Sequence, residues 1–418
     1  MVEDDSTHHR SSQPSTGATP APLHVLIVGG GVGGLCLAQG LKKSGISVAV
    51  YERDESAQFR SQGYRIGLKE AGAQALRDCL PEDLFNLCMA TSIKQATRMV
   101  FLDHQLNQKF SKPIPQIEPG VSGFGVNRLT LREILLADLD DMVHFGKTFE
   151  RFAQGEDGQV RAYFADGTAA TGDLLVGADG TDSAVRDLLV PDAVIDELHY
   201  AIYGKTPITA DTLAWVPDVL IDSFNRVIGP EGAAMAVATC RTREPVADAT
   251  AKFAPRLHLT DMPGYLSWTM TLADEQFRNA DGPTLHRVAS DTVKQWHPSV
   301  RRIIDEADIP ATFAITITSA RLVKQWRATN ATLLGDAIHT MSPGRGEGAN
   351  VALRDAQQLR HALVDVAAKR VPFVQAKAQY EAEMLRYGFE AVADSLNKPF
   401  APWRPGQGQA STSHTDQG

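Results

Sequence analysis

The feature that constrains this chain most is a glycine-rich stretch near its start, HVLIVGGGVGGLCLAQGLKKSGISVAVYERD, from His24 to Asp54. Its first apolar run indicates a strand, and Gly29, Gly31 and Gly34 follow with the spacing G-x-G-x-x-G. A helical pattern comes next, and then a second strand-like run that ends at Glu52, 18 residues after Gly34. Together these features are typical of a dinucleotide-binding βαβ unit. We therefore expect an α/β fold of the Rossmann type rather than a plain glycine-rich turn.

Each residue type in this fingerprint has a physical task. Glycines allow the backbone to approach a pyrophosphate closely, and the free N–H groups at the start of the helix bind its negative charge. An acid at the end of the second strand accepts hydrogen bonds from ribose hydroxyls. We therefore predict that Gly29, Gly31, Gly34 and Glu52 bind a dinucleotide, and we add Arg53, beside Glu52, to the candidate cofactor-binding residues.

Two further strand-like runs end in an acid. DLLVGADGTDSAVRDLL, from Asp173, carries Asp179 at the end of an apolar run, and LLGDAIHTMSPGRGEGANVALRDA, from Leu333, carries Asp336 in the same position. The second run continues into a loop with a proline and several glycines, and then into a helical pattern. A typical nicotinamide dehydrogenase needs neither element, so together they argue against that class.

These three elements, in this order, resemble the single-component FAD-dependent monooxygenases, the family that includes para-hydroxybenzoate and salicylate hydroxylases. The similarity covers roughly residues 23–365 and is strongest at the motifs. It implies an α/β fold in which a Rossmann-like FAD-binding domain is interleaved with a β-sheet substrate domain and followed by C-terminal helices. The resemblance also implies FAD as cofactor and NAD(P)H as co-substrate. It further suggests that the protein is a family member from fungal secondary metabolism.

The resemblance gives expected roles to the late acid and to the loop after it. Asp336 would lie on the ribityl and ribose side of FAD, and the loop would pass along the flavin ring, where small residues let the backbone come close. The helix that follows would direct its positive end at the N1–C2=O edge of the flavin. The candidate residues of this loop are Pro343, Gly346, Gly348, Ala349 and Asn350.

Two residues near this loop carry separate expectations. Glu347 stands where the family usually has glutamine, and a carboxylate beside N1 would oppose the negative charge of the reduced flavin. We therefore expect Glu347 to point away from the flavin or to pair with Arg345. His339 follows the late acid, and we expect it to be a packed structural residue rather than a catalytic one.

The resemblance also assigns several charged residues. Asp179 and Arg186 match an Asp-Gly motif between FAD and the nicotinamide route, although Asp179 could equally hold a turn. In VNRLTLREILLADL, Arg128 is expected to contact FAD, whereas Arg132 is expected to be a solvated or ion-paired helix residue. Arg65 occupies the family's flavin-edge segment and would contact flavin or substrate, or else form a surface ion pair.

The substrate sheet departs from the phenol-hydroxylating branch of the family. Fungal members of that branch often carry arginine in a Tyr-Arg-Gly segment, with a tyrosine further along. Here the matching segment is AIYGKTPI, with Tyr203 where the arginine is expected, and the later run GAAMAVATC has no tyrosine. This makes an olefin, an indole or another apolar ring as good a substrate candidate as a phenol. Tyr203 and Arg65 are the candidate catalytic residues.

The same reasoning divides the chain into domains. The FAD-binding domain takes two separate segments, because the late acid belongs beside the first glycine loop. The predicted limits are a disordered tail at 1–22, the FAD-binding domain at 23–190 and 320–365, the substrate-binding sheet at 191–319 with part of 93–124, C-terminal helices at 366–400, and a loose tail at 401–418.

Composition excludes several classes of function. Lys and Arg total 41 against 50 Asp and Glu, for a net charge of −9, and no long basic block occurs, so nucleic acid is not the expected partner. No apolar run approaches the roughly 20 residues of a membrane span, and the N-terminal residues lack a signal-peptide pattern. The four cysteines have no metal or disulfide spacing. We expect a cytoplasmic protein without a metal site.

The predicted function is that of a monooxygenase. Using NAD(P)H and O2, it would hydroxylate or epoxidise a small, largely apolar or aromatic metabolite through a flavin C4a-hydroperoxide, as the resemblance implies. The cofactor carries the hard chemistry, so no catalytic triad is expected. Two alternatives stay open, a flavin-dependent reductase or dehydrogenase on the same fold, and an FAD-holding protein without turnover. The sequence leaves the oligomeric state open.

Overall fold

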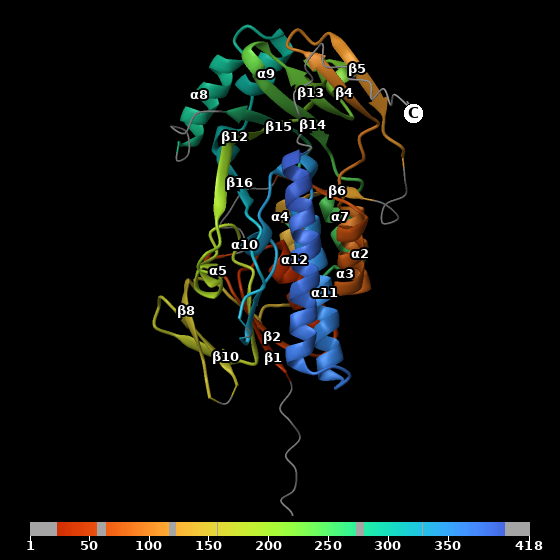
Figure 1. Cartoon of the computed structure of the whole chain (residues 1–418). Helices are drawn as coiled ribbons and strands as arrows, with labels where there is room; N and C mark the ends of the chain where they lie inside the picture. The colour runs from red at the N-terminus through yellow and green to blue at the C-terminus, as the bar shows by residue number, and fades with distance from the viewer. Residues whose placement is uncertain are drawn as a thin grey trace, which may run out of the picture.

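The structure is a computed structural model that describes residues 23–56, 64–116, 123–156, 158–272, 280–327 and 329–397. The tails predicted at 1–22 and 401–418 lie outside the described residues. Two large sheets, one above the other in Figure 1, organise the chain, and long helices flank the lower one.

The lower sheet has five parallel strands in the order β17-β11-β1-β2-β7. Its strands are near-continuous apolar runs because helices or further strands cover both faces. The strands are β1 (His24–Val28), β2 (Ser47–Tyr51), β7 (Val143–His144), β11 (Leu174–Gly177) and β17 (Ala331–Leu333). The carboxyl ends of β1, β2, β11 and β17 therefore meet at one edge, which is where parallel sheets bind ligands.

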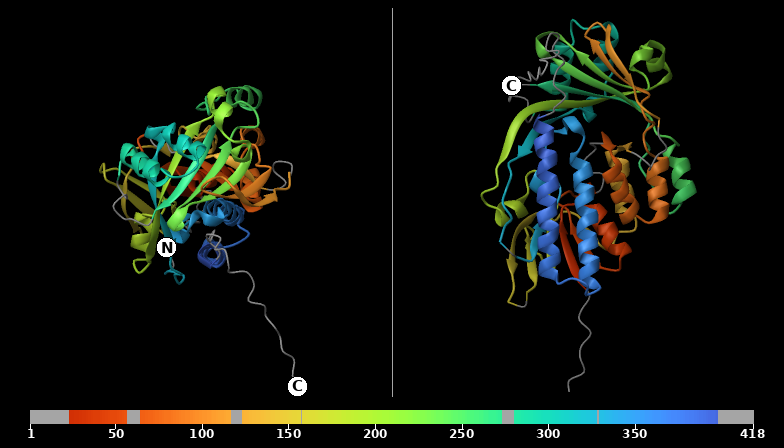
Figure 2. Two further views of the ribbon diagram at one scale, coloured as in Figure 1. Left: turned by 90° about the horizontal axis from the view of Figure 1, so that it is seen from above. Right: turned by 45° about the vertical axis from the view of Figure 1, so that its right-hand side comes forward.

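Helices cover one face of this sheet, and a small antiparallel sheet lies beside β11. α1 (Val32–Lys43) joins β1 to β2, and α11 (Gly348–Ala367) packs against it. α11 and α12 (Phe373–Asn397) run side by side in all three ribbon views (Figures 1 and 2). The remaining elements here are α2 (Glu70–Cys79), α3 (Glu82–Ala90), α4 (Arg128–Leu136), α5 (Ala184–Leu189), α7 (Val246–Phe253), α10 (Asp336–His339), β8 (Phe149–Gln154), β9 (Val160–Phe164) and β10 (Ala169–Gly172).

The upper sheet has seven strands in the order β16-β12-β15-β14-β13-β4-β5. All neighbours are antiparallel except β13 and β4, which run parallel, so the sheet is mixed. The strands are β4 (Arg98–Asp103), β5 (Gln108–Pro113), β12 (Ile195–Pro207), β13 (Ser223–Ile228), β14 (Ala234–Cys240), β15 (Tyr265–Leu272) and β16 (Phe313–Ala320). α6 (Ala210–Trp215), α8 (Gly282–Thr292) and α9 (Pro298–Asp305) accompany it, with short 3-10 turns at Asp218–Leu220, Pro230–Gly232 and Ile309–Ala311.

The two faces of the upper sheet have different partners. On one face Ile202 and Trp268 form an apolar core with Leu285 of α8 and Val300 of α9. The other face turns toward the small sheet of β3 (Arg65–Leu68) and β6 (Phe124–Asn127), where the Asn127 amide donates a 3.2 Å hydrogen bond to the Tyr265 hydroxyl. We call this second face the inner face.

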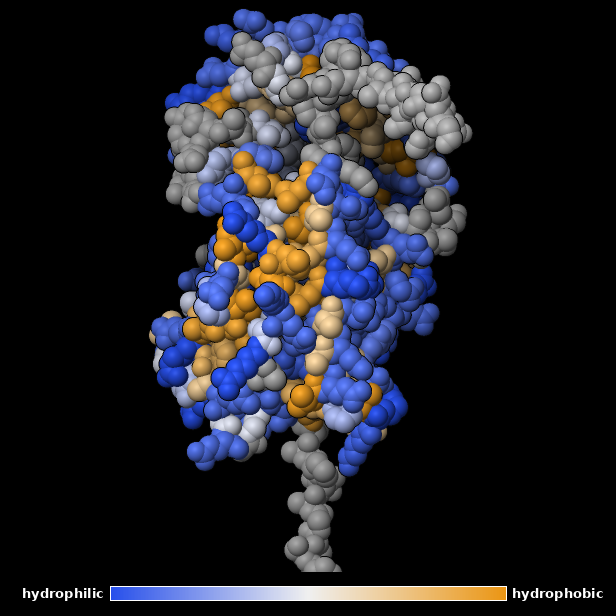
Figure 3. Space-filling view, viewed as in Figure 1, coloured by the Kyte–Doolittle hydropathy of each residue, from blue (hydrophilic) through white to orange (hydrophobic). Residues whose placement is uncertain are grey.

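The predicted fold class is confirmed. A Rossmann-like sheet and a second sheet are interleaved along the chain, with long helices at its C-terminal end. β4 and β5 come from the early segment 93–124 that the sequence analysis gave to the substrate sheet, and we propose to keep the predicted domain limits. Figure 3 shows an apolar band over the region of α5, β16 and α12. Within the described residues, no helix is long and apolar enough to cross a membrane.

Candidate cofactor site and active site

The glycine turn after β1 has the geometry that a dinucleotide requires. Gly29 has a φ of 108°, and a Cβ there would clash with the backbone of Ala178, so only glycine fits. A Cβ on Gly34 would clash with the carbonyl oxygen of Gly29, because helix and strand pack closely there. At Gly31 no atom lies within 4 Å of a Cβ position, and no side chain caps the start of α1. Free helix N–H groups beside open space fit a pyrophosphate.

Glu52 is buried at the end of β2, with 6% of its surface exposed. One carboxylate oxygen accepts a 2.6 Å hydrogen bond from the Gly30 amide, and the other accepts a 2.9 Å bond from the Asp54 amide. Each carboxylate oxygen has further acceptor capacity for a ribose hydroxyl. Glu52 therefore holds the glycine turn in place and can also bind a sugar.

Arg132 clamps these acids, although the sequence analysis gave it no role at the site. Its Nε donates a 3.1 Å hydrogen bond to the Gly30 carbonyl, and its guanidinium lies 3.4 Å from Asp54 and 3.6 Å from Glu52. Arg132 is buried, so the expectation of an ion-paired residue is confirmed and that of a solvated one is wrong. Its spacing of four from Arg128 places both on one helix face, a signal that could have identified it.

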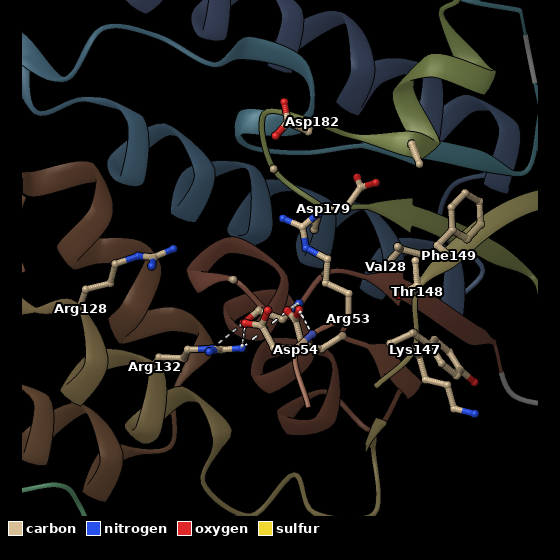
Figure 4. Close-up of a pocket in the computed structure, with 18 residues that line it drawn as sticks. Val28, Arg53, Asp54, Arg128, Arg132, Lys147, Thr148, Phe149, Asp179 and Asp182 are labelled. Atoms are coloured by element: carbon tan, nitrogen blue, oxygen red, sulfur yellow. Dashed lines mark hydrogen bonds and ion pairs between the residues drawn. The ribbon is translucent and has the colours of Figure 1, made fainter. Parts of the chain in front are cut away.

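These residues line one pocket at the carboxyl edge of the lower sheet (Figure 4). Six predicted residues lie there, Gly29, Gly31, Glu52, Arg53, Arg128 and Asp179. The pocket also contains residues that the sequence analysis did not predict there, from segments at β2, β8 and α5 and from α4. These are Asp54, Arg132, Lys147, Thr148, Phe149 and Asp182.

Asp179 at the end of β11 serves the turn and the pocket together. Its carboxylate accepts a 2.5 Å hydrogen bond from the Ser183 hydroxyl and a 3.2 Å bond from the Val185 amide. Burial raises its pKa above the usual value, while these hydrogen bonds oppose the rise. Arg186 is buried and donates to the carbonyl oxygens of Thr181, at 2.6 Å, and Ala337, at 3.4 Å. Both roles considered for Asp179 are therefore compatible with its geometry.

Asp336 is the first residue of α10 and follows Gly335, whose φ is 64°. A Cβ on Gly348 would lie only 3.7 Å from its carboxylate, so acid and loop are adjacent. The surrounding protein raises the pKa of Asp336, and the charges of His339 and Arg128 oppose this rise. Asp336 is nonetheless exposed to solvent, so a ligand can reach its carboxylate.

Asn350 ties the late loop to β3. Its side-chain oxygen accepts a 2.6 Å hydrogen bond from the Lys69 amide, and its nitrogen donates to the carbonyls of Gly67, at 3.0 Å, and Gly346, at 2.7 Å. The Asn350 amide group is thus occupied by backbone partners. These bonds hold the loop at Gly346 against β3. Roles of Asn350 and Ala349 toward FAD stay predictions.

The rest of this loop leaves the start of α11 uncapped. A short 3-10 turn at Pro343–Arg345 leads to Gly346, whose φ of 64° favours glycine. α11 then begins at Gly348 with no side-chain cap on its first N–H groups. Glu347 pairs with Lys69, whereas Arg345 lies 3.5 Å from Asp394. Of the two expectations for Glu347, pairing with Arg345 is therefore wrong, and pointing away from the flavin stays a prediction.

His339 is fully buried behind this loop, and its Nε2 lies 2.7 Å from an Asp355 carboxylate oxygen. The expectation of a packed histidine is confirmed. Burial by itself lowers the pKa of His339, but the charge and hydrogen bond of Asp355, with the charge of Asp336, outweigh it, and the net pKa is raised.

Tyr203 and Arg65, the two candidate catalytic residues, lie under the upper sheet. The Tyr203 ring stacks on Phe313, with centroids 5.6 Å apart, and lies 5.5 Å from the Tyr64 ring. Burial, with the neighbouring Tyr64, raises the pKa of Tyr203 to about 12. Burial raises the pKa of the Cys240 thiol and the charge of Arg65 opposes the rise, while a Cβ on Gly125 of β6 would lie 3.1 Å from the Arg65 Nε. Tyr203 is therefore a neutral hydrogen-bond donor at pH 7, and Arg65 is a charge beneath the sheet.

Residues 137–392 match the family described as FAD binding domain, and residues 27–79 match the NAD(P)-binding Rossmann-like domain. The chain belongs to the FAD-dependent monooxygenase family. FAD is accordingly its cofactor, and Gly31, the uncapped α1 and Glu52 fit the nucleotide half of FAD. Within the described residues, no group of three His, Cys, Asp or Glu side chains could hold a metal ion.

Several fungal relatives are similar along most of the chain. The dual O-methyltransferase/FAD-dependent monooxygenases CTB3 of Cercospora beticola and elcB of Phaeosphaeria nodorum are both 32% identical, over 86% and 83% of this chain. The chain spans only 44% and 41% of their lengths. The FAD-dependent monooxygenase thnD of Trichoderma harzianum is 28% identical over 88% of this chain and 91% of its own length.

Solved structures of other proteins share the fold. A protein from Photorhabdus luminescens, described as an FAD-containing monooxygenase, is 29% identical and covers 90% of this chain and 97% of its own, with a TM-score of 0.76. Klebsiella pneumoniae HpxO, crystallised with FAD and uric acid, is 23% identical over 90% of this chain and 87% of its own, with a TM-score of 0.71. At that identity the second similarity shows the fold alone.

We expect Glu52→Ala to weaken FAD binding by about ten- to a hundredfold, because hydrogen bonds to charged groups contribute roughly 1.5–3 kcal/mol. Titration of the apoprotein with FAD, followed by flavin fluorescence, measures the dissociation constant. Glu55→Ala, which removes an exposed carboxylate three residues on, is the matched control. Unchanged FAD affinity in a folded Glu52→Ala protein would show that Glu52 does not bind the ribose.

Proposed function

We propose that this chain is a monooxygenase that uses NAD(P)H and O2 to hydroxylate or epoxidise a small, largely apolar or aromatic metabolite. The observation that carries the proposal is that the nucleotide pocket, Asp336 and the inner face of the upper sheet come together around Arg128 and Tyr64. Arg128 lines the nucleotide pocket, opposes the raised pKa of Asp336, and lies 5.6 Å from the Tyr64 ring, which in turn contacts Tyr203 of the inner face. A cofactor that extends from the pocket past Asp336 would end beneath Tyr203. Because the resemblance points to fungal members, we place the reaction in secondary metabolism.

FAD, when bound, supplies the electron transfer and the activation of O2 that such a reaction needs. The chain's own contribution is to position and to tune. The uncapped start of α11 offers partial positive charge to the flavin ring, and Asn350 fixes the loop that carries it. Lys69 neutralises Glu347, so this carboxylate opposes negative charge on the ring less than a free one would.

The aromatic cluster of Tyr64, Tyr203 and Phe313 covers the proposed reaction site on the side of the upper sheet. Three rings within 6 Å of one another exclude water from the place where oxygen would be transferred. Tyr203 keeps its proton at neutral pH, so its role is to donate a hydrogen bond to substrate. A general-base role for Tyr203 is not part of the proposal.

We expect Tyr203→Phe to raise the KM for the substrate by roughly two- to tenfold, the worth of one neutral hydrogen bond. The dependence of kcat on pH between about 6 and 9 should not change, because the pKa of Tyr203 is about 12. Steady-state kinetics across this range measure both quantities. Loss of a pH inflection in Tyr203→Phe would instead assign the tyrosine to proton transfer.

Oxygen consumption separates the proposal from its alternatives. The monooxygenase should consume O2 and NAD(P)H together, and labelled O2 should place one labelled atom in the product. A reductase on the same fold would oxidise NAD(P)H without labelling any product. An FAD-holding protein without turnover would bind FAD and leave NAD(P)H unchanged. A screen of aromatic metabolites for stimulated NAD(P)H oxidation, followed by mass analysis, distinguishes the three.

A further inference from the structure

A single row of residues crosses the upper sheet from one side to the other. The strand register pairs each member with the next on the neighbouring strand. Residues directly opposite one another in a sheet point to the same face. The row runs Phe101 (β4), Arg226 (β13), Ala236 (β14), Thr269 (β15), Tyr203 (β12) and Phe313 (β16).

This row lies on the inner face. Its Tyr203 end contacts Tyr64 on the side of β3, whereas the alternate residues Val227 and Trp268 belong to the core with α8 and α9. Between Arg226 and Tyr203 the side chains are small, since Ala236 lies opposite Thr269 and, two residues along the strands, Ala238 lies opposite Ser267. Small side chains flanked by rings at both ends suit a flat molecule lying against the sheet.

Arg226 is the charged residue of this row. Its side chain is half-buried, and within the part of the chain that the structure describes no acid pairs with it. Burial lowers its pKa, and no neighbouring carboxylate opposes the change. Two buried arginines have acid partners, Arg132 with Glu52 and Arg186 with Asp187. A partly desolvated guanidinium without a partner is costly, and a bound anion would remove that cost.

We propose that Arg226 binds a carboxylate at one end of a planar aromatic substrate whose other end lies beside Tyr203. This inference rests on the proposed function, because it takes the inner face to be the substrate site. Three strand spacings separate Tyr203 from Arg226, about 14 Å between their backbones, which gives room for fused rings. The guanidinium fork matches a carboxylate with two parallel hydrogen bonds, which gives the ligand one orientation.

Binding of matched acid and amide probes tests the proposal without turnover. The oxidised FAD-bound protein is titrated in a calorimeter with benzoate, 2-naphthoate and anthracene-2-carboxylate, and with the carboxamide of each. We expect at least one acid to bind about ten- to a hundredfold more tightly than its amide, the range for a charged hydrogen bond. Arg226→Met should remove this preference, and Arg226→Lys should keep part of it. Arg226→Met should also raise KM rather than lower kcat for an acidic substrate.

Arg98→Met is the matched control. Arg98 is on β4, on the face shared with the core residues Val100 and Leu102, and donates a 3.3 Å hydrogen bond to the Asp218 carbonyl. The Arg98→Met substitution removes the same charge from the other face of the sheet and should leave the preference for acids over amides unchanged. If no acid binds more tightly than its amide, whether all bind equally or none binds, the proposal is overturned. A preference that survives Arg226→Met overturns it as well.

A failure of this proposal and a failure of the proposed function give different experimental results. A protein that binds FAD and labels a product from O2, yet shows no acid preference, keeps the monooxygenase function and loses the role of Arg226. A protein that prefers acids through Arg226 but never consumes O2 loses the proposed function. Flavin absorbance of each variant confirms that FAD stays bound, since Arg226 is not among the residues that line the nucleotide pocket.

Discussion

Asp336→Ala is expected to lower FAD affinity and to increase the share of consumed NAD(P)H that ends as hydrogen peroxide. The Asp336 carboxylate starts α10, is reachable by a ligand, and lies against Gly348 at the start of α11. In the proposed site it binds the sugar-alcohol chain of FAD, while the loop it touches positions the ring. Without this anchor the ring should shift, and a misplacement of about 1 Å can cost about a hundredfold in rate.

The measurement is the ratio of hydrogen peroxide released to NAD(P)H consumed, at saturating FAD, together with the dissociation constant for FAD. Asp192→Ala, which removes an exposed carboxylate on the surface, is the control. Equal peroxide ratios and equal FAD affinities in Asp336→Ala and the unchanged protein would mean that this acid does not touch the cofactor.

Asp355→Ala is expected to destabilise the protein by about 3–5 kcal/mol, the cost of breaking a buried charged pair. Asp355 is fully buried and accepts three hydrogen bonds, from the Gly335 amide at 2.7 Å, the Tyr387 hydroxyl at 2.6 Å and, when Nε2 carries a proton, His339 at 2.7 Å. Its loss leaves a histidine and a backbone N–H without their acceptor. Because Gly335 precedes Asp336, the flavin loop should loosen as well.

Denaturant unfolding at saturating FAD measures this loss. Tyr387→Phe, which removes only one of the three hydrogen bonds, should cost about 1 kcal/mol and so serves as the graded control. A loss in Asp355→Ala no larger than that in Tyr387→Phe would contradict the network.

The same network predicts a pH dependence of stability. The pKa of His339 is raised in the folded protein by Asp355 and Asp336, against the effect of burial. A raised histidine pKa stabilises the fold fully below the unfolded value of about 6.5, and this stability is lost as pH rises through the folded pKa. Unfolding free energies measured on both sides of pH 6.5 should show this loss, and Asp355→Asn should reduce it. A pH dependence that Asp355→Asn leaves unchanged would assign it to another group.

Local sequence determined the parts of this protein in which backbone geometry depends on residue type. The turn at Gly29 needs a positive φ, and the strands that end in Asp179 and Asp336 are apolar runs bounded by glycine. Such features are visible in a few consecutive residues, so the fold class and six residues of the nucleotide pocket could be predicted. The register and the mixed direction of the upper sheet could not be predicted in the same way, because pairing partners are distant in sequence.

Tertiary structure alone decided which charges meet. Lys69 pairs with Glu347 across 278 positions of sequence, and Arg132 reaches Gly30 across 102, so no local pattern pairs them. Tyr203 and Arg226 share a row only because three strand pairings place them opposite common neighbours, and a shift of one residue would turn either to the other face. Local sequence sets the backbone turns that a cofactor needs, whereas strand register and helix packing set the partners of each charged side chain.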